Sequence, residues 1–215
     1  MKKGLTEIVM ILDASGSMHG WEKDTIGGFN SIIENQKKED GTAFVTTIVF
    51  NDRHKIIHDR TDISKIAPLT EKDYIPNGST ALLDTVGFAI EHISSIHKYA
   101  REEDRPEKTL FVITTDGMEN ASRRYTYERV REMITRQKER YGWEFLFLGA
   151  NMDAAREAAR FGIDADRAAN YHADAKGTEV IYGAVCETVC DFRASRPVAA
   201  GWKKRIDEDF NRRGG

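Results

Sequence analysis

Three oxygen-bearing side chains follow one another closely where the first apolar segment of the chain ends. Asp13, Ser15 and Ser17 alternate along the motif DASGS, with Gly16 between the two serines. Alternate residues of an extended or tightly looping chain point the same way, so these oxygens can converge on one point. Gly16 lets the backbone turn back closely there. The motif therefore predicts a cluster of oxygen atoms beyond the end of a strand.

Two later segments carry oxygen atoms suited to the same point. NGSTALLD (77–84) enters a long apolar helix, and TTDGMEN (114–120) ends another apolar segment. In an open α/β sheet, ligands bind outside the carboxyl ends of the strands, where the strand order reverses. We therefore expect one site at that edge, built from Asp13, Ser15, Ser17, Thr80 and Asp116.

The elements that must position these residues alternate along the chain. Short, apolar, β-branched segments predict strands at 6–15, 42–51, 108–117 and 144–151. Helical patterns occupy 22–38, 80–101, 126–141, 153–161 and 177–194. The strand segments are nearly continuous in apolar residues, which is typical of a parallel sheet covered by helices on both faces.

Two further segments complete the predicted sheet. HKIIHDRTD (54–62) follows the second strand too closely for a parallel crossover, so it predicts an antiparallel edge strand. A weaker strand is expected within 167–173. Together the elements predict an α/β fold, a doubly wound, Rossmann-like three-layer sandwich with a mostly parallel sheet and one antiparallel edge strand.

On these motifs the chain resembles a von Willebrand factor type A (vWA) domain. DASGS resembles that family's DxSxS pattern, GST resembles its threonine loop at Thr80, and TDG resembles its later aspartate motif at Asp116. Ser79 departs from the pattern, because a glycine often precedes the threonine. The pattern of elements from about residue 5 to 195 has the family's length, and with no secretion signal expected the chain is most similar to bacterial or phage stand-alone members.

The resemblance implies a metal-ion-dependent adhesion site (MIDAS). The hydroxyls of Ser15, Ser17 and Thr80 would supply oxygen without neutralising the ion, while Asp13 and Asp116 would bind it or hold its waters. Such a set suits Mg²⁺; Mn²⁺ fits the same oxygens, and Ca²⁺ is not excluded. The family's mechanism leaves one coordination position for an Asp or Glu of a protein partner, so the resemblance implies a non-enzymatic binding module.

Other interpretations of the motifs stay open. Taken singly, the serines and Thr80 could be turn residues or helix caps, and Asp116 before Gly117 is an ordinary turn signature. Asp13 could instead be the nucleophile of a phosphohydrolase, since DASGS superficially resembles the DxDxT loop of haloacid-dehalogenase-type phosphatases. Ser15 stands where that family's acid/base aspartate should be, which leaves no obvious proton donor. The resemblance also allows an adaptor subunit beside a ring ATPase, although no residue names that partner.

Local roles are preferred for the polar and apolar side chains around the expected site. We interpret five residues that would flank the site as solvated loop residues: Met18, His19, Trp21, Glu119 and Asn120. Asp84 lies one helical turn after Thr80, where a carboxylate favours the helix N-terminus, and we place it outside the metal shell.

The cysteines and the arginine-rich helix also receive local roles. Cys186 and Cys190 lie four apart on a helical pattern, beyond disulfide reach, and are expected to be buried small hydrophobes. The arginines between residues 123 and 140 interleave with glutamates, which favours a salt-bridged outer helix face over a nucleic-acid patch. The sparse cysteines favour a reducing, cytoplasmic location.

Composition limits the remaining classes. A formal net charge of −3 disfavours a general nucleic-acid binder. The longest clean apolar run, Ile8–Leu12, is far short of the roughly 20 residues that a membrane span needs. With 215 residues, 40% of them apolar, we expect one vWA-like domain over 1–195. Residues 196–215 predict a short helix or partly disordered C-terminal tail. The oligomeric state is left open.

Overall fold

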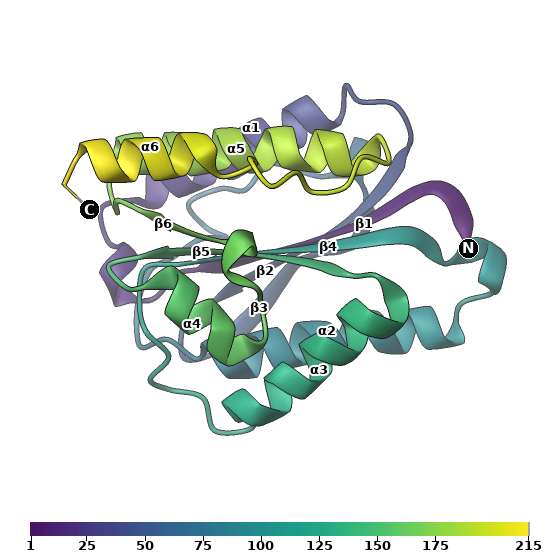
Figure 1. The fold of residues 1–215 in the computed structure, drawn as a ribbon, viewed down its shortest axis with the longest axis horizontal. Helices are drawn as coiled ribbons and strands as arrows, with labels where there is room; N and C mark the ends of the chain where they lie inside the picture. Colours follow the sequence, from purple (N-terminus) through teal and green to yellow (C-terminus); the bar gives the residue numbers. More distant parts are fainter. Residues whose placement is uncertain (215) are drawn as a thin grey trace.

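A six-stranded sheet of order β3-β2-β1-β4-β5-β6 forms the middle layer of the structure, a computed structural model that describes residues 1–214 (Figure 1). The strands are β1 (Lys2–Asp13), β2 (Thr42–Phe50), β3 (His54–Asp62), β4 (Pro106–Thr115), β5 (Glu144–Ala150) and β6 (Ala168–Tyr171). The helices are α1 (Glu22–Gln36), α2 (Leu82–Tyr99), α3 (Tyr127–Tyr141), α4 (Ala154–Phe161), α5 (Ala175–Arg193) and α6 (Lys204–Arg212).

Helices cover both faces of the sheet. Helices α1, α5 and α6 lie on one face, and α2, α3 and α4 lie on the other (Figure 1). Strand β3 pairs antiparallel with β2, while the other neighbours pair parallel. The predicted α/β three-layer sandwich, with its antiparallel edge strand, is confirmed, and the weaker strand expected in 167–173 is β6.

The strand order reverses between β1 and β4, which are the two central strands. They run parallel, with Leu12 opposite Thr114. The chain leaves β1 through α1 toward β2, and it leaves β4 through α3 toward β5, so the two connections diverge. A crevice for ligands forms at such a reversal, outside the carboxyl ends of the strands. The motifs around Asp13 and Asp116 stand at the two sides of this reversal.

Helix starts differ slightly from those predicted. Helix α2 begins at Leu82 rather than at Thr80, so Thr80 belongs to the preceding loop. Helices α3, α4 and α5 each begin just after a residue whose side chain accepts a backbone N–H of the first turn, namely Thr126, Asp153 and Asp174. These caps satisfy amide groups that have no partner inside the helix.

Two apolar cores lie on the two faces of the sheet. Along β1, Val9 and Ile11 face α2 and α3, whereas Met10 and Leu12 face α1 and α5. All four side chains are at most 1% exposed. Because successive side chains of a strand point to opposite faces, a central strand covered on both sides must be apolar at nearly every position. This is why the sequence of β1 reads as a continuous apolar run.

The C-terminal segment packs on the same core as the rest of the chain. Val198, Trp202 and Ile206 belong to the cluster between the sheet and helices α1 and α5. Helix α6 contacts both α5 and β6. The helix that the sequence analysis allowed within residues 196–215 is therefore a packed element of the fold, spanning Lys204–Arg212.

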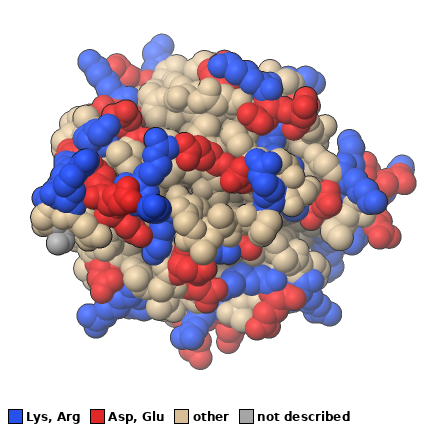
Figure 2. Space-filling model, turned by 45° about the horizontal axis from the view of Figure 1, so that its top comes forward, with Lys and Arg blue, Asp and Glu red and all other residues tan. Residues whose placement is uncertain are grey.

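The surface over α1, α5 and α6 carries charges of both signs. Figure 2 shows basic and acidic side chains interspersed on that face, without a continuous area of one sign. Within residues 1–214, every helix is too short or too polar to cross a lipid bilayer.

Candidate metal centre

The carboxylate of Asp13 is buried at the carboxyl end of β1 and is held by two donors. Its side chain is 2% exposed. One oxygen accepts the backbone N–H of Ser15 at 2.7 Å, and the other accepts the hydroxyl of Thr115 at 2.6 Å. The hydroxyl of Tyr74 donates to the Asp13 backbone carbonyl. These contacts fix the orientation of Asp13 at the point where β1 and β4 leave the sheet.

Three hydroxyl oxygens converge beside Gly117, as the motifs predict. A Cβ atom built on Gly117 would lie 3.0 Å from Thr80 Oγ1, 3.7 Å from Ser17 Oγ and 3.8 Å from Ser15 Oγ. The hydroxyls of Ser15 and Ser17 lie 3.1 Å apart. A glycine at this position therefore keeps open a small cradle that is lined by hydroxyl groups from two separate loops.

The second carboxylate closes the same cluster. Ser17 Oγ donates to Asp116 Oδ1 at 2.6 Å, and Asp116 is 5% exposed. Ser15 and Thr80 are buried as well, while Ser17 is exposed. All five side chains that the sequence singled out are thus brought to one place.

No basic side chain of residues 1–214 forms an ion pair with the two carboxyl groups. Burial raises the pKa of Asp13, hydrogen bonds from Thr115 and Ser15 oppose this, and the charge of Asp116 raises it further. Burial also raises the pKa of Asp116, against the hydrogen bond from Ser17. The site therefore has an electrostatic deficit that a cation would correct.

The donor set fits a hard cation. Within the described part of the chain, no three His, Cys, Asp or Glu side chains come together as a metal site. The cluster at Gly117 instead combines three hydroxyls with two carboxylates. Oxygen-only sets of this kind, with waters completing the shell, suit Mg²⁺ and Mn²⁺, and they lack the thiolate or imidazole that softer ions prefer.

Backbone contacts hold the two loops of the cradle against each other. The N–H of Gly16 donates to the carbonyl of Gly78 at 3.0 Å, and the N–H of Asn77 donates to the carbonyl of Ala14 at 2.9 Å. Gly78 has a φ of +69°, which a residue with a side chain rarely adopts. Ser79, the position that departs from the family pattern, is exposed.

Two residues that orient the site were not predicted from the sequence. Thr115 and Tyr74 both donate to Asp13, the first to its side chain and the second to its backbone. Thr115 is the last residue of β4 and directly precedes Asp116. Its place beside the predicted motif could therefore have marked it as a neighbour of the site. Tyr74 lies 61 residues from Asp13 in a loop, and no sequence pattern indicates its contact.

The rim residues are less uniform than predicted. His19 and Asn120 are exposed, but Met18 is 8% exposed and packs in the core, which corrects the interpretation of Met18 as a solvated loop residue. Glu119 is half-buried, and its carboxylate accepts backbone N–H groups of Leu83 and Ser122. The reason is local: the first turn after β1 folds Met18 inward, and Glu119 reaches a helix start that needs acceptors.

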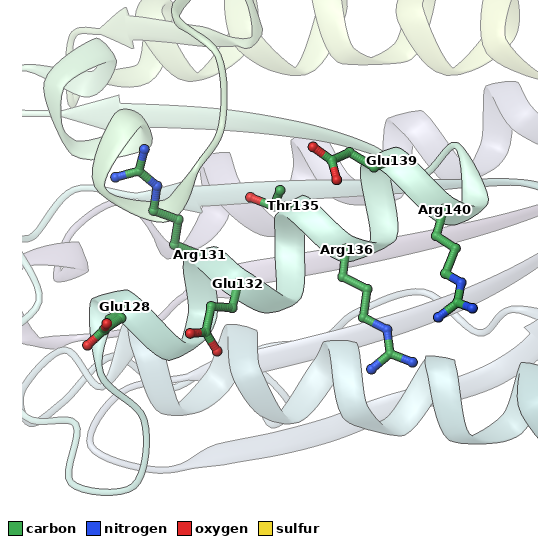
Figure 3. A pocket seen from close by; sticks show the side chains of 7 residues that line it. All are labelled: Glu128, Arg131, Glu132, Thr135, Arg136, Glu139 and Arg140. Atoms are coloured by element: carbon green, nitrogen blue, oxygen red, sulfur yellow. The ribbon is translucent and has the colours of Figure 1, made fainter.

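Two other features do not form a second site. Figure 3 shows a depression along α3 that is lined by Glu128, Arg131, Glu132, Thr135, Arg136, Glu139 and Arg140. All come from one helix, and their charges alternate in sign, as expected for a solvated face. The two cysteines are half-buried, and burial raises the pKa of Cys190 to about 11, so this thiol stays protonated and unreactive.

Comparison with known proteins gives structural matches only. No protein-family model matches the chain, and no curated protein sequence matches it. Proximal thread matrix protein 1 of the mussel byssus has 16% identity and a TM-score of 0.58 over 87% of this chain and 46% of its own. A von Willebrand factor type A protein of Catenulispora acidiphila has 14% identity and a TM-score of 0.59 over 86% of this chain and 42% of its own.

A third match is the manganese-loaded TRAP protein of Plasmodium vivax, with 14% identity and a TM-score of 0.56 over 84% of this chain and 73% of its own. The mussel protein is also known with a zinc-occupied MIDAS motif. This chain spans less than half the length of the mussel and Catenulispora proteins. At these identities the likeness establishes the fold, and it agrees with the strand order described above. The chain therefore has the fold of a von Willebrand factor type A domain.

Proposed function

We propose that the chain is a binding module that uses a divalent cation, Mg²⁺ or Mn²⁺, to capture an acidic side chain of a protein partner. The observation that carries the proposal is the cradle at Gly117, where three hydroxyls and two unbalanced buried carboxylates surround one point. A cation there would relieve the repulsion between Asp13 and Asp116.

Each residue of the cradle has a distinct part. Ser15, Ser17 and Thr80 would offer neutral oxygen, and Asp13 and Asp116 would offer negative charge. When bound, the ion supplies a positive centre that attracts a carboxylate from outside. Two carboxylates formally balance the charge of a divalent ion, so the ion would stay attractive to an outside carboxylate if Asp13 or Asp116 acted through a water instead of binding it directly. Thr115 and the Ser15 N–H hold Asp13 in place for this role.

The structural matches support this choice by analogy. One matched protein is known with zinc in a MIDAS motif and another is manganese-loaded. Fold likeness alone does not assign function, so the argument depends on the side chains at the site. A cytoplasmic location remains a prediction from cysteine usage.

The alternative of an Asp13-dependent phosphohydrolase has less support. A nucleophilic carboxylate must be reached by a phosphate ester, whereas Asp13 is 2% exposed at the end of β1. Ser15 supplies no acid for the leaving group. Sustained phosphomonoester turnover that disappears in Asp13→Asn would favour the phosphohydrolase over the binding module.

Metal uptake tests the first half of the proposal. Titration calorimetry should detect binding of Mg²⁺ and Mn²⁺ to the wild-type chain, and the double variant Ser15→Ala/Ser17→Ala should bind at least about tenfold more weakly, about 1.4 kcal/mol. The matched control is Ser95→Ala, which removes an exposed hydroxyl near the far end of α2. Absence of heat for both metals in the wild type would contradict the proposal.

Carboxylate capture tests the second half. Acetate serves as the probe: with Mn²⁺ bound, saturating acetate should displace a water from the ion and lower the water-proton relaxation rate. Proteins retained on immobilised chain in Mg²⁺ should be released by EDTA and should not bind Asp13→Ala. Retention that is insensitive to both EDTA and Asp13→Ala would show that partner binding lies elsewhere.

A further inference from the structure

Helix α2, which follows Thr80, begins without a cap of its own. The residue before its first turn is Ala81, which has no side chain able to accept a hydrogen bond. The first backbone N–H groups of a helix have no partner within the helix. Here Glu119 Oε2 accepts the N–H of Leu83 at 2.7 Å, and Ser122 Oγ accepts that of Asp84 at 2.9 Å. Both acceptors come from the loop after β4.

The same helix turn caps the loop in return. The carboxylate of Asp84 accepts three consecutive backbone N–H groups, those of Arg123, Arg124 and Tyr125, at 2.8–2.9 Å. Backbone donors in this number favour the charged carboxylate, and the pKa of Asp84 is lowered although burial opposes this. We call the reciprocal contacts of Asp84, Glu119 and Ser122 the clasp.

Glu119 is the centre of the clasp. Its Oε1 accepts the N–H groups of Ala121 and Ser122 at 2.9 and 2.7 Å, and its Oε2 also accepts the hydroxyl of Ser122 at 2.7 Å. One carboxylate thus takes four hydrogen bonds, which an amide of the same shape cannot do because half of it is a donor.

The clasp joins the two segments that carry the cradle. Thr80 lies just before α2, and Asp116 lies just before the loop. Between them, Asn120 Oδ1 accepts the N–H of Thr80 at 2.9 Å, and the N–H of Asn120 donates to the Thr80 carbonyl at 3.0 Å. Thr80 has no direct hydrogen bond to Asp116 among the described contacts, so the Asn120 connection is the link between its loop and the loop after β4, while the Gly16–Gly78 bond holds its loop to β1.

We propose that Glu119 and Asp84 are positioning residues of the metal centre, which hold Thr80 and Asp116 at their binding separation before the ion arrives. The inference rests on the proposed function. A site whose loops are already ordered does not lose conformational entropy on binding, so affinity depends on the clasp. Partners of metal ligands that do not themselves touch the ion typically contribute about 10- to 100-fold in metal affinity.

The experiment compares Mn²⁺ affinity with stability. Mn²⁺ binding is measured by electron paramagnetic resonance of the free ion, and stability by urea unfolding in EDTA. Glu119→Gln replaces two acceptor positions by donors, and Ser122→Ala removes only the central hydroxyl. The control is Asp62→Asn at the opposite end of the sheet, where the Asp62 carboxylate accepts the N–H and hydroxyl of Ser64 at 2.9 and 2.7 Å.

We expect Glu119→Gln to weaken Mn²⁺ binding by about 10- to 100-fold and Ser122→Ala by a few-fold. The control should lose stability while it keeps wild-type affinity. A second readout is amide hydrogen exchange: in the wild type, the amides of Leu83 and Ser122 should be equally protected with and without Mn²⁺.

Three results would overturn the inference. Wild-type affinity in both clasp variants, together with lowered stability, would make the clasp merely structural. Protection of Leu83 and Ser122 that appears only with Mn²⁺ would show that the ion orders the loops. If wild-type chain takes up neither Mn²⁺ nor Mg²⁺, the proposed function itself fails and the inference with it.

Discussion

Two carboxylates on β1, six residues apart, are buried in opposite ways. Glu7 is 0% exposed and has two basic neighbours: Arg60 Nε lies 2.8 Å from Glu7 Oε2, and His97 Nε2 lies 3.3 Å from the same oxygen. Asp13 is 2% exposed and is held by the Thr115 hydroxyl and the Ser15 backbone N–H, with no basic neighbour among the described ion pairs. One acid is neutralised inside the fold, and the other is left negative at the edge of the sheet.

The difference separates a structural ion pair from the pair of carboxylates that we propose as a cation site. The fold accepts an unfavourable backbone conformation to supply Arg60, whose φ is +42° at a shift in the β2–β3 register. It makes no such adjustment for Asp13 and Asp116. Burying a charge without a partner is costly, and two neighbouring carboxylates buried in this way are the pattern expected of a candidate functional site.

Neutralising each acid in turn tests whether Glu7 and Asp13 contribute differently to the stability of the fold. Glu7→Gln leaves the guanidinium of Arg60 without its counter-charge and should lower the free energy of unfolding by about 3 kcal/mol, at the low end for a buried pair because Arg60 is partly exposed. Asp13→Asn removes an unbalanced charge and should change it by less than about 1 kcal/mol in EDTA. Urea unfolding measures both, and equal losses would refute the distinction.

Filling the cradle tests whether the hydroxyls matter as well as the charge. In Gly117→Ala the new methyl would lie 3.0 Å from Thr80 Oγ1, in the space that we assign to the ion. Affinity for Mg²⁺ should fall by at least about tenfold, about 1.4 kcal/mol, in titration calorimetry. The control Gly183→Ala lies in α5 with open space around its Cβ and should leave affinity unchanged. Unaltered Mg²⁺ binding in Gly117→Ala would show that the ion does not bind at this position.

A third carboxylate, Asp84, differs from both because its charge is stabilised mainly by backbone N–H groups, with a smaller contribution from the charge of Arg124. Its pKa is lowered in the folded state: burial opposes this, but the N–H groups of Arg123, Tyr125 and Arg124 prevail. A lowered folded-state pKa means that the stabilisation is complete above the unfolded value near 3.8 and is lost as pH falls through the folded value.

The difference in unfolding free energy between wild type and Asp84→Asn should therefore be about 1 kcal/mol at pH 7 and should shrink below about pH 4. Urea unfolding at a series of pH values measures it. Asp24→Asn, at a half-buried position in the first turn of α1, provides the background titration. A difference that grows on acidification would contradict the assigned sign.

The five cradle residues could be predicted because their signals are local. Asp13, Ser15 and Ser17 lie together in one loop, and nearly continuous apolar runs place the strands before Asp13 and Asp116 in the centre of a parallel sheet. Once those strands are central and parallel, their carboxyl ends must meet at one edge.

Contacts between segments that are distant in the sequence could not be predicted. Arg60 reaches Glu7 from a backbone conformation with positive φ. Arginine rarely adopts this conformation, so residue preferences do not predict the contact. The sequence explains Asp84 sufficiently as an acidic residue near a helix N-terminus. It gives no sign of the hydrogen bonds that Asp84 accepts from residues 39 to 41 positions away. In the C-terminal segment, Trp202, Ile206 and Phe210 are spaced by four, a helical signal that their charged neighbours mask.

The C-terminal segment also determines how the sheet can be extended. Lys203 Nζ donates to the carbonyls of Ala165 and Ala168, and Trp202 Nε1 donates to that of Asp166, all at or just before β6. An unguarded outer strand is a template for pairing with another chain. Because Trp202 and Lys203 occupy part of this margin, they restrict the pairing of another strand with β6, and we expect a chain shortened before Pro197 to self-associate more readily.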